Sequence, residues 1–426
     1  MNEIGIVLII ALSILGFGAV SGRLIKSPIT APMVFTSIGF LIGPGGFGLA
    51  EINVGAESTM LLAELTLVLI LFTDASRINI ATLHSEHTIP VRLLGLGLPL
   101  TIVAGFVVAL VLFPEFGVWH VAVLAAILAP TDAALGQVVV SFESVPVRIR
   151  QALNVESGLN DGIVVPAIMI FLWSAGANLE GDSGGFWARF VGMQLVLGPL
   201  VGFIVAWLGG TMVGTCRDRG WMSEEFQRLA LIALALAAWT IAHYVSGNGF
   251  IAAFTAGLVL GAQHRSLVDK LHRFAEAEGQ FLSLLVFMLF GAAMIPEALE
   301  HLHGFNPEVI GYALLSLTFI RILPVSLSLI GAGLRFRTHL FLGWFGPRGI
   351  ATIIFALLVL EESGLPHAQP LFSIAIITVV LSILLHGLTA WPLSNRYAQL
   401  VQSDEMCKEE MVKTPEMPTR FGSSRR

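Results

Sequence analysis

Residues 119–139 read WHVAVLAAILAPTDAALGQVV, an apolar stretch that is interrupted by the polar segment Ala129–Asp132 (APTD). A proline within a helix removes a backbone hydrogen-bond donor and clashes with the preceding turn, so we expect the helix to break at Pro130. A second apolar stretch, 338–360, contains the interruption Gly346–Gly349 (GPRG). Irregular backbone at membrane depth is tolerated where it is buried in protein or lines a cavity. The two interruptions therefore predict a helical membrane protein with a polar site among its helices.

The composition supports a membrane protein. The chain has 426 residues, of which 55% are hydrophobic and 12% charged, and its mean hydropathy is +0.84. Soluble domains carry about 25% charged residues, so a soluble enzyme and a disordered chain are excluded. The net charge of -6 shows no basic excess, which also excludes a nucleic-acid partner. Cys216 and Cys407 are too few and too far apart for a disulfide framework or a metal site, and no cofactor is predicted.

Apolar segments of about 20 residues are long enough to cross a bilayer. The hydropathy predicts about thirteen spans in an all-α polytopic fold. They lie at 4–20, 30–48, 58–75, 89–113, 119–139, 152–175, 187–214, 227–245, 249–263, 278–296, 306–333, 338–360 and 371–393. Residues 1–395 are therefore predicted to form one transmembrane domain. The polar segment 396–426 is predicted to be a disordered cytoplasmic tail.

Basic residues in the connections between the spans alternate from one side to the other. The basic connections carry Arg23, Lys26, Arg77, Arg92, Arg148, Arg150, Arg217, Arg219, Arg228, Arg265, Lys270, Arg273, Arg335, Arg337 and Arg396. The remaining connections are acidic or neutral, apart from Arg189. By the positive-inside rule, the N-terminus is predicted to lie outside and the C-terminus in the cytoplasm.

Each interruption falls in the middle span of a set of three. The sets cover about 89–175 and 306–393 and are predicted to cross the membrane in opposite directions. Paired interrupted spans in two inverted repeats are a sequence signature of the substrate site of secondary transporters. The alternative is two unrelated proline kinks, since proline is common in membrane helices.

Several spans retain charged side chains at a cost of roughly 2.5–3.5 kcal/mol each. They are Asp74, Asp132, Glu156, Asp161, Arg321 and Arg348. Four of them, from four different spans, are predicted to reach the same depth. We therefore expect them to converge on one site.

Helical spacing divides the polar residues of 152–175 between two faces. Ser157 and Asp161 are four residues apart and share a face, which offers a hydroxyl and a carboxylate suited to an alkali cation. Glu156 and Asn160 share the adjacent face. A buried carboxylate needs a positive partner, and Arg321 is the candidate for Glu156. We expect that pair to hold Asn160.

The interrupted spans place helix ends, with their partial charges, inside the membrane. Asp132 can neutralise the positive ends and Arg348 the negative ends. Thr131 can offer a hydroxyl and freed carbonyls to a cation. Asp74 is predicted to line the cytoplasmic approach or to join the ligands, and the alternative is an interfacial carboxylate beside Arg77.

These residues resemble the cation–proton antiporters of the sodium/hydrogen exchanger superfamily, in the branch whose ion-site helix carries Asn-Asp. The resemblance covers about residues 1–395 and rests on four motifs: Glu156–Gly162 (ESGLNDG), Ala129–Asp132 (APTD), Gly346–Gly349 (GPRG) and Phe319–Arg321 (FIR). It implies a fold with two crossing broken helices, a mobile core half, a dimerisation half and a homodimer. Proline at 347 stands where leucine is more usual in the family.

The resemblance also implies roles for individual residues. Asp161 would bind the cation and the proton in turn, with sodium held at Asp161, Ser157 and Thr131 and with Asn160 as a ligand or a support. Glu156 and Arg321 would be a structural ion pair. Many relatives have a glutamate before a glycine pair where this chain has Asp74-Ala75-Ser76, which puts the part of Asp74 in ion coordination in doubt.

The predicted function is antiport of a monovalent cation, with sodium preferred to lithium or potassium, against protons. Cation and proton would compete at Asp161 with alternating access, and the neutral Asn160 predicts electroneutral one-for-one exchange. The alternatives are a potassium/proton antiporter, a cation-coupled solute transporter of the same architecture and a passive channel. A membrane enzyme is not predicted, since His84–His87 lacks the spacing of a zinc-protease helix.

Overall fold

The computed structural model describes residues 3–24, 27–50, 54, 57–78, 88–180, 184–302, 306–361, 365–403, 409–412 and 414. All regular structure in these ranges is helical. The helices are α1 (Glu3–Leu24), α2 (Ala31–Ile42), α3 (Glu57–Arg77), α5 (Thr88–Arg92), η1 (Leu93–Gly97), α6 (Leu98–Leu112), α7 (Val118–Ile127), α8 (Ala133–Val140), α9 (Val147–Glu180), α10 (Gly184–Asp218), α11 (Glu224–Tyr244), α12 (Gly249–Gln263), α13 (Arg265–Leu289), η2 (Phe290–Met294), α14 (Ile295–His301), α15 (Pro307–Leu317), α16 (Phe319–Ser328), α17 (Phe336–Trp344), α18 (Ile350–Glu361) and α19 (Ala368–Ser403).

The helices confirm the all-α membrane architecture. In the described ranges, nine helices are long and apolar enough to cross a bilayer, and four shorter apolar helices accompany them. Each predicted span overlaps at least one helix. The number of spans and the orientation of the termini stay predictions.

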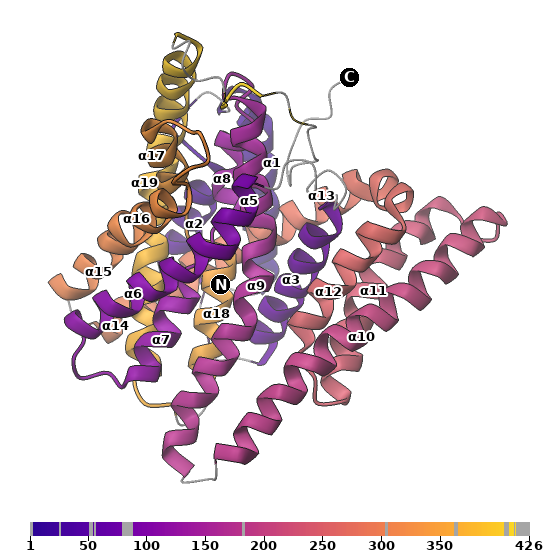
Figure 1. Cartoon of the computed structure of the whole chain (residues 1–426), viewed down its shortest axis with the longest axis horizontal. Coiled ribbons are helices and arrows are strands. Elements are labelled where there is room, and N and C mark those ends of the chain that lie inside the picture. Colours follow the sequence, from indigo (N-terminus) through magenta and orange to yellow (C-terminus); the bar gives the residue numbers. More distant parts are fainter. Residues whose placement is uncertain are drawn as a thin grey trace.

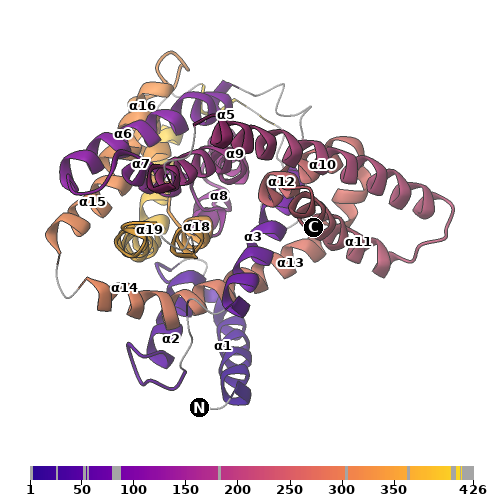
Figure 2. The same cartoon turned by 90° about the horizontal axis from the view of Figure 1, so that it is seen from below.

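The helices form two groups that lie side by side in Figure 2. The core group consists of α5–α9 and α15–α19, and the scaffold group of α1–α3 and α10–α14. The two halves of the core group have the same order of elements. Each begins with a helix that contains an irregular turn (α5, η1 and α6, or α15 and α16), which is followed by an interrupted helix (α7 and α8, or α17 and α18). Each half ends with a long helix that contains a proline (α9 or α19). Helix α9 contacts α3, α10 and α12, so it lies at the boundary between the groups.

Glycines allow α12 to pack closely against α3 in the scaffold group. A Cβ atom on Gly257 would lie 2.2 Å from the Phe72 carbonyl oxygen, and one on Gly261 would lie 2.3 Å from the Ser76 carbonyl oxygen. Small residues at such positions let helix backbones approach each other within a membrane. The contact fixes the end of α3 that carries Asp74.

The last helix extends beyond the predicted end of the membrane domain. The sequence predicts a disordered tail from residue 396, but α19 continues to Ser403. The extension is helical because its apolar face is buried: Tyr397 is 5% exposed, and its ring stacks on Phe341 at a centroid distance of 3.9 Å. For the remainder of the predicted tail, residues 404–408, 413 and 415–426 lie outside the described residues.

A short segment after α19 contacts the ends of two core helices. The buried Glu410 carboxylate accepts hydrogen bonds from the Arg335 backbone N–H (2.8 Å) and the Thr338 hydroxyl (2.9 Å) at the start of α17. Glu409 pairs with Arg148 at the start of α9 at 2.8 Å. The segment therefore links the start of α17 to the start of α9, and both starts lie at the same end of the core group (Figure 1).

Replacing Glu410 by alanine is expected to destabilise the protein. The Arg335 N–H and the Thr338 hydroxyl would lose their acceptor, and an unsatisfied buried donor costs about 1–3 kcal/mol. Thermal unfolding in detergent should show a clearly lower Tm. Glu409→Ala is the matched control: its ion pair is half-exposed, so its loss should change stability by less than about 1 kcal/mol. Equal Tm values for the two variants would contradict the role assigned to Glu410.

Candidate functional site

The two helix interruptions meet at Asp132. Its backbone N–H donates to the Pro347 carbonyl oxygen (2.8 Å), which joins the two breaks directly. Its carboxylate accepts from the backbone N–H groups of Leu135 (2.8 Å, Oδ1) and Ile350 (2.7 Å, Oδ2). Since Leu135 lies in the first turn of α8 and Ile350 begins α18, one carboxylate caps the positive ends of both half-helices.

Arg348 interacts with the opposite ends of helices. Its fully buried guanidinium donates to the carbonyl oxygens of Gly346 (2.7 Å) and Ser316 (3.5 Å), which lie near the C-terminal ends of α17 and α15. Its backbone N–H donates to the Ser382 hydroxyl at 2.7 Å. A positive charge is favourable at the negative end of a helix. The arrangement thus balances the dipoles of the broken helices on both sides of the crossing.

Ser382 is a site residue that the sequence analysis missed. It accepts from Arg348 and lies one turn before His386, whose Nε2 contacts the Trp344 carbonyl oxygen at 2.9 Å. These two side chains of α19 therefore contact the backbone of the second interruption, between α17 and α18. The sequence pattern that could have predicted this contact is a serine and a histidine four residues apart, on one face of an apolar helix.

Glu156 and Arg321 form a buried ion pair between α9 and α16, with 2.5 Å between Arg321 Nη2 and Glu156 Oε1. Both residues are at most 1% exposed. Gly346 lies directly over this pair, since a Cβ atom there would be 2.5 Å from Arg321 Nε and 3.0 Å from Thr131 Cγ2. The second break therefore packs against both the ion pair and the first break.

Three oxygen-bearing side chains meet where the first break faces α9. The Asn160 amide donates from Nδ2 to the Thr131 hydroxyl (2.7 Å), and that hydroxyl lies 3.0 Å from the Ser157 hydroxyl. The expectation that Glu156 and Arg321 hold Asn160 is wrong for this amide donor. The unwound segment brings the Thr131 hydroxyl against α9, so the amide has an acceptor there. In the part of the chain that the structure describes, the buried Asn160 Oδ1 has no hydrogen-bond partner.

Asp161 follows this cluster and is 6% exposed. It lies one turn after Ser157 on α9, and the next residue, Gly162, faces the scaffold group: a Cβ atom there would be 2.2 Å from the Phe254 ring of α12. A cavity of about 10 Å³ between α8 and α9 is lined by Ser157, Asn154 and Gln137 among others. Asp161 is thus buried beside the core–scaffold boundary, and a space about the size of a water molecule lies next to Ser157, one member of the cluster.

Asp74 is brought close to α9 but has a partner on its own helix. Its Oδ1 lies 3.5 Å from Arg77 Nη1, and its Cβ is 4.0 Å from the position of a Cβ on Gly158. The structure therefore contains the pairing with Arg77 that the sequence analysis kept as the alternative.

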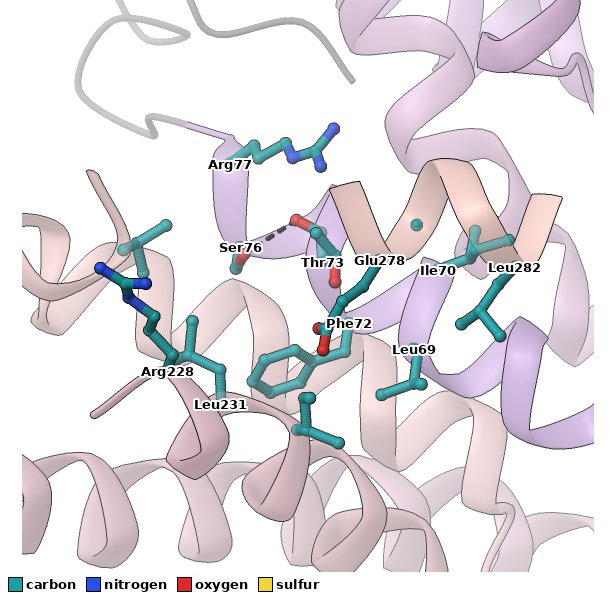
Figure 3. A pocket seen from close by; sticks show the side chains of 13 residues that line it. Leu69, Ile70, Phe72, Thr73, Ser76, Arg77, Arg228, Leu231, Glu278 and Leu282 are labelled. Atoms are coloured by element: carbon teal, nitrogen blue, oxygen red, sulfur yellow. Dashed lines mark hydrogen bonds between the residues drawn. The ribbon is translucent and has the colours of Figure 1, made fainter. Parts of the chain in front are cut away.

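A second cavity lies on another face of α3. It has a volume of about 30 Å³ and is lined by residues of α3, α11 and α13, with Glu278 beside Phe72 and Thr73 (Figure 3). None of the residues at the crossing of the broken helices lines it. The candidate site is therefore the crossing and not this cavity.

Comparison with known proteins shows to which protein family the chain belongs. The family model described as sodium/hydrogen exchanger, transmembrane, matches residues 7–396. The chain belongs to this family. The resemblance seen in the sequence is confirmed, and the chain is a multi-pass protein of the cell membrane.

The chain is distantly related to individual proteins of known sequence. It is 27% identical over 396 residues to the K(+)/H(+) antiporter NhaP of Alkalimonas amylolytica, covering 91% of this chain and 66% of the relative. It is 25% identical to the K(+)/H(+) antiporter NhaP2 of Shewanella oneidensis, covering 92% and 65%. The chain thus spans slightly less than two thirds of the length of these relatives.

A solved structure shows the same fold. The sodium proton antiporter MjNhaP1 from Methanocaldococcus jannaschii superposes with a TM-score of 0.75 at 20% identity, covering 95% of this chain and 100% of that chain. The antiporter fold predicted for the chain is therefore confirmed.

Replacing Gly349 by alanine is expected to disrupt the contact between the two interrupted helices. The new Cβ atom would lie 2.5 Å from both Asp132 Cγ and Oδ2, so the carboxylate would have to leave the helix ends that it caps. Losing two caps costs about 2 kcal/mol, and thermal unfolding in detergent should show it. Gly136→Ala in α8 is the control, because its Cβ would meet no atom within 4 Å. A Gly349→Ala protein as stable as this control would contradict the steric argument.

Proposed function

We propose that this exchanger chain carries out antiport of a monovalent cation against protons by alternating access. The observation that carries the proposal is the cluster of Thr131, Ser157 and Asn160 beside the buried Asp161, where two broken helices cross. Discontinuous helices at the interface of two inverted repeats are where secondary transporters bind their substrates and coupling ions.

Each residue has a distinct part in the proposed site. Asp161 binds the cation and the proton in turn, because a carboxylate that has accepted a proton no longer carries the charge that holds the cation. The hydroxyls of Ser157 and Thr131 are hard oxygen ligands that complete the cation site. Asn160 orients Thr131 through its amide donor and has Oδ1 available as a further ligand.

The residues around the cluster keep its geometry. Asp132 and Arg348 neutralise the ends of the broken helices, and the pair of Glu156 and Arg321 fixes α9 against α16. Asp132 and Arg348 contact backbone groups at helix ends, and Glu156 pairs with Arg321, so we propose structural roles for these four residues. Asp74, which pairs with Arg77, lines the cytoplasmic approach.

Sodium is the proposed cation, and potassium is the second candidate. Sodium fits a compact set of one carboxylate and two hydroxyls, whereas both relatives named above are K(+)/H(+) antiporters. The test is proton flux in proteoliposomes, with sodium, potassium and lithium added in turn to the same preparation. If potassium drives proton flux and sodium does not, the choice of sodium is wrong. If none of the three cations drives proton flux, the proposal of antiport is wrong.

The exchange is expected to be electroneutral. Asn160 does not titrate, so the site has one carboxylate, Asp161, and one charge leaves as one enters. In proteoliposomes with equal sodium and proton concentrations on both sides, a membrane potential imposed by a potassium gradient and valinomycin should then move no protons. Proton movement that follows the sign of the potential would contradict one-for-one exchange.

The protein is also proposed to form a homodimer. The apolar helix α1 has no part of its membrane-spanning window buried within the described chain, so it offers a face to a second copy. Mass measurement of the detergent-solubilised protein tests this, and a monomer at every concentration would overturn it.

A further inference from the structure

The phenyl ring of Phe254 lies against the backbone of the core group next to Asp161. Helices α9 and α12 meet where the core and scaffold groups adjoin (Figure 2). A Cβ atom on Gly162 would lie 2.2 Å from Cδ2 of that ring and 2.4 Å from Cγ, so no side chain fits between the ring and α9. Gly162 is buried, and Phe254 is 8% exposed. The ring therefore covers the backbone of α9 beside the carboxylate on which the proposed exchange depends.

Helix α12 is held by its neighbours, so it presents the ring at a fixed position. Its glycines pack closely against α3, and a glycine of α10 packs as closely against α12: a Cβ atom on Gly202 would lie 2.3 Å from the Ala252 carbonyl oxygen. The Asn248 side chain caps the start of α12 by accepting from the Ile251 backbone N–H at 3.0 Å. These contacts leave α12 little freedom to move away from α9. A separation of the ring from the core group therefore has to come from a movement of α9.

The tight contact at Gly162 is a local feature of the boundary. Gly158 lies one turn earlier on α9 and also faces the scaffold group, but a Cβ atom there would lie 3.7 Å from Ile78 Cδ1 and 4.0 Å from Asp74 Cβ, which is ordinary van der Waals contact. Near the same turn, α9 borders the water-sized cavity beside Ser157. The boundary is thus closed by an aromatic ring at Gly162 and packed less tightly one turn away.

We propose that Phe254 is the barrier of the core–scaffold boundary at Asp161. An apolar ring offers no ligand to an ion, and stripping an ion of water without replacing its ligands is costly, so the ring closes this part of the boundary to water and cations. Alternating access requires one group of helices to move against the other, and this movement takes Gly162 off the ring. The inference rests on the proposed antiport, and it makes Phe254 a positioning residue that acts through the placement of α9 and does not bind the cation.

The first test is a reversible cross-link between the two helices. A Cβ atom on Gly162 would lie 2.4 Å from Phe254 Cγ, so cysteines at both positions come within the Cβ–Cβ separation of about 3.5–4.5 Å that a disulfide requires. The variant Gly162→Cys/Phe254→Cys is made in a background that carries Cys216→Ser and Cys407→Ser. Oxidation with copper phenanthroline should slow sodium–proton exchange at least about tenfold, because a conformational step limits turnover, and dithiothreitol should restore the rate.

Two measurements make the cross-linking result decisive. Free thiols are counted before and after oxidation, and each single-cysteine variant is oxidised in parallel and should keep its exchange rate. Thiols that stay free would show that the two residues do not meet. Complete cross-linking with an unchanged exchange rate would show that the core group does not have to leave the ring. Either result would overturn the proposal.

The second test changes the size of the two residues. Gly162→Ala should lower the maximal rate of exchange at least about tenfold while the KM for sodium stays within about twofold, because overpacking displaces α9 and leaves the ligands in place. Adding Phe254→Ala removes the ring atoms that the new methyl group meets, so the double variant should regain at least about a third of the wild-type rate, per unit of protein that is monodisperse and unfolds cooperatively. Gly176→Ala on α9 is the control, because its Cβ atom would meet no atom within 4 Å.

The outcomes separate the barrier from the transport function. Gly162→Ala exchanging as fast as Gly176→Ala, or staying slow once the Phe254 ring is removed, would overturn the role of Phe254 while the wild-type protein still exchanges. A wild-type protein without exchange would instead contradict the proposed antiport.

Discussion

Replacing Asp161 by asparagine is expected to abolish cation–proton exchange. Asparagine keeps the size of the side chain but can neither release a proton nor attract a cation. Losing one partner of a buried charge interaction costs about 3 kcal/mol or more, which is roughly a 100-fold loss of affinity. Proton flux in proteoliposomes should therefore fall to the level of empty vesicles with sodium, potassium and lithium alike.

The interpretation depends on a protein that still folds. Asp161→Asn keeps the size of a side chain that is 6% exposed, so the variant should still fold and unfold cooperatively in detergent. Asp218→Asn is the matched control, since that carboxylate is exposed beside Arg217 and lies outside the crossing. The control should exchange at the wild-type rate. Sizeable exchange by Asp161→Asn at saturating sodium would refute the central role of this carboxylate.

Replacing Arg321 by methionine is expected to be strongly destabilising. Glu156 would be left as a buried charge whose partner, now 2.5 Å away, is lost. Breaking a buried pair in this way costs about 3–5 kcal/mol, and the yield of folded protein and its Tm should both fall sharply.

The double variant Glu156→Gln/Arg321→Met separates the charge from the packing. Replacing a buried pair by neutral residues of similar volume is often close to neutral for stability, so the double variant should recover most of the Tm lost in Arg321→Met. The exchange rate of the double variant then shows whether the ion pair is needed for transport as well as for stability. We expect exchange to persist. A double variant as unstable as the single one would mean that packing of Arg321, and not its charge, holds α9 against α16.

Local sequence predicted the helices and their interruptions. The breaks at Pro130 and Pro347 follow from the chemistry of proline, which acts on its own turn of helix. The spans follow from hydropathy, because lipid requires every backbone group to be satisfied within the helix. The faces of 152–175 follow from helical spacing, and Ser157, Asn160 and Asp161 lie one turn apart or adjacent as expected.

Contacts between distant segments could not be predicted in the same way. The sequence assigned Asp132 to the positive helix ends, but only the fold shows that one carboxylate caps α8 and α18 together. Asn160 was expected to be held by Glu156 and Arg321, but its amide donates to Thr131, whose position depends on how the unwound segment before α8 packs against α9. The segment around Glu410 was read as disordered because its composition is polar, and composition does not reveal an acceptor site at the start of α17.

The sequence by itself determined that this chain crosses a membrane, where its helices break and which residues carry charge at depth. These properties depend on neighbours along the chain and on the solvent that surrounds it. Only the tertiary structure decided which of those charges meet, which of them cap helix ends, and that Thr131, Ser157 and Asn160 form one cluster next to Asp161. The physical reason is that electrostatic and hydrogen-bond energies depend on distances of a few ångström between segments that the sequence separates by tens to hundreds of residues.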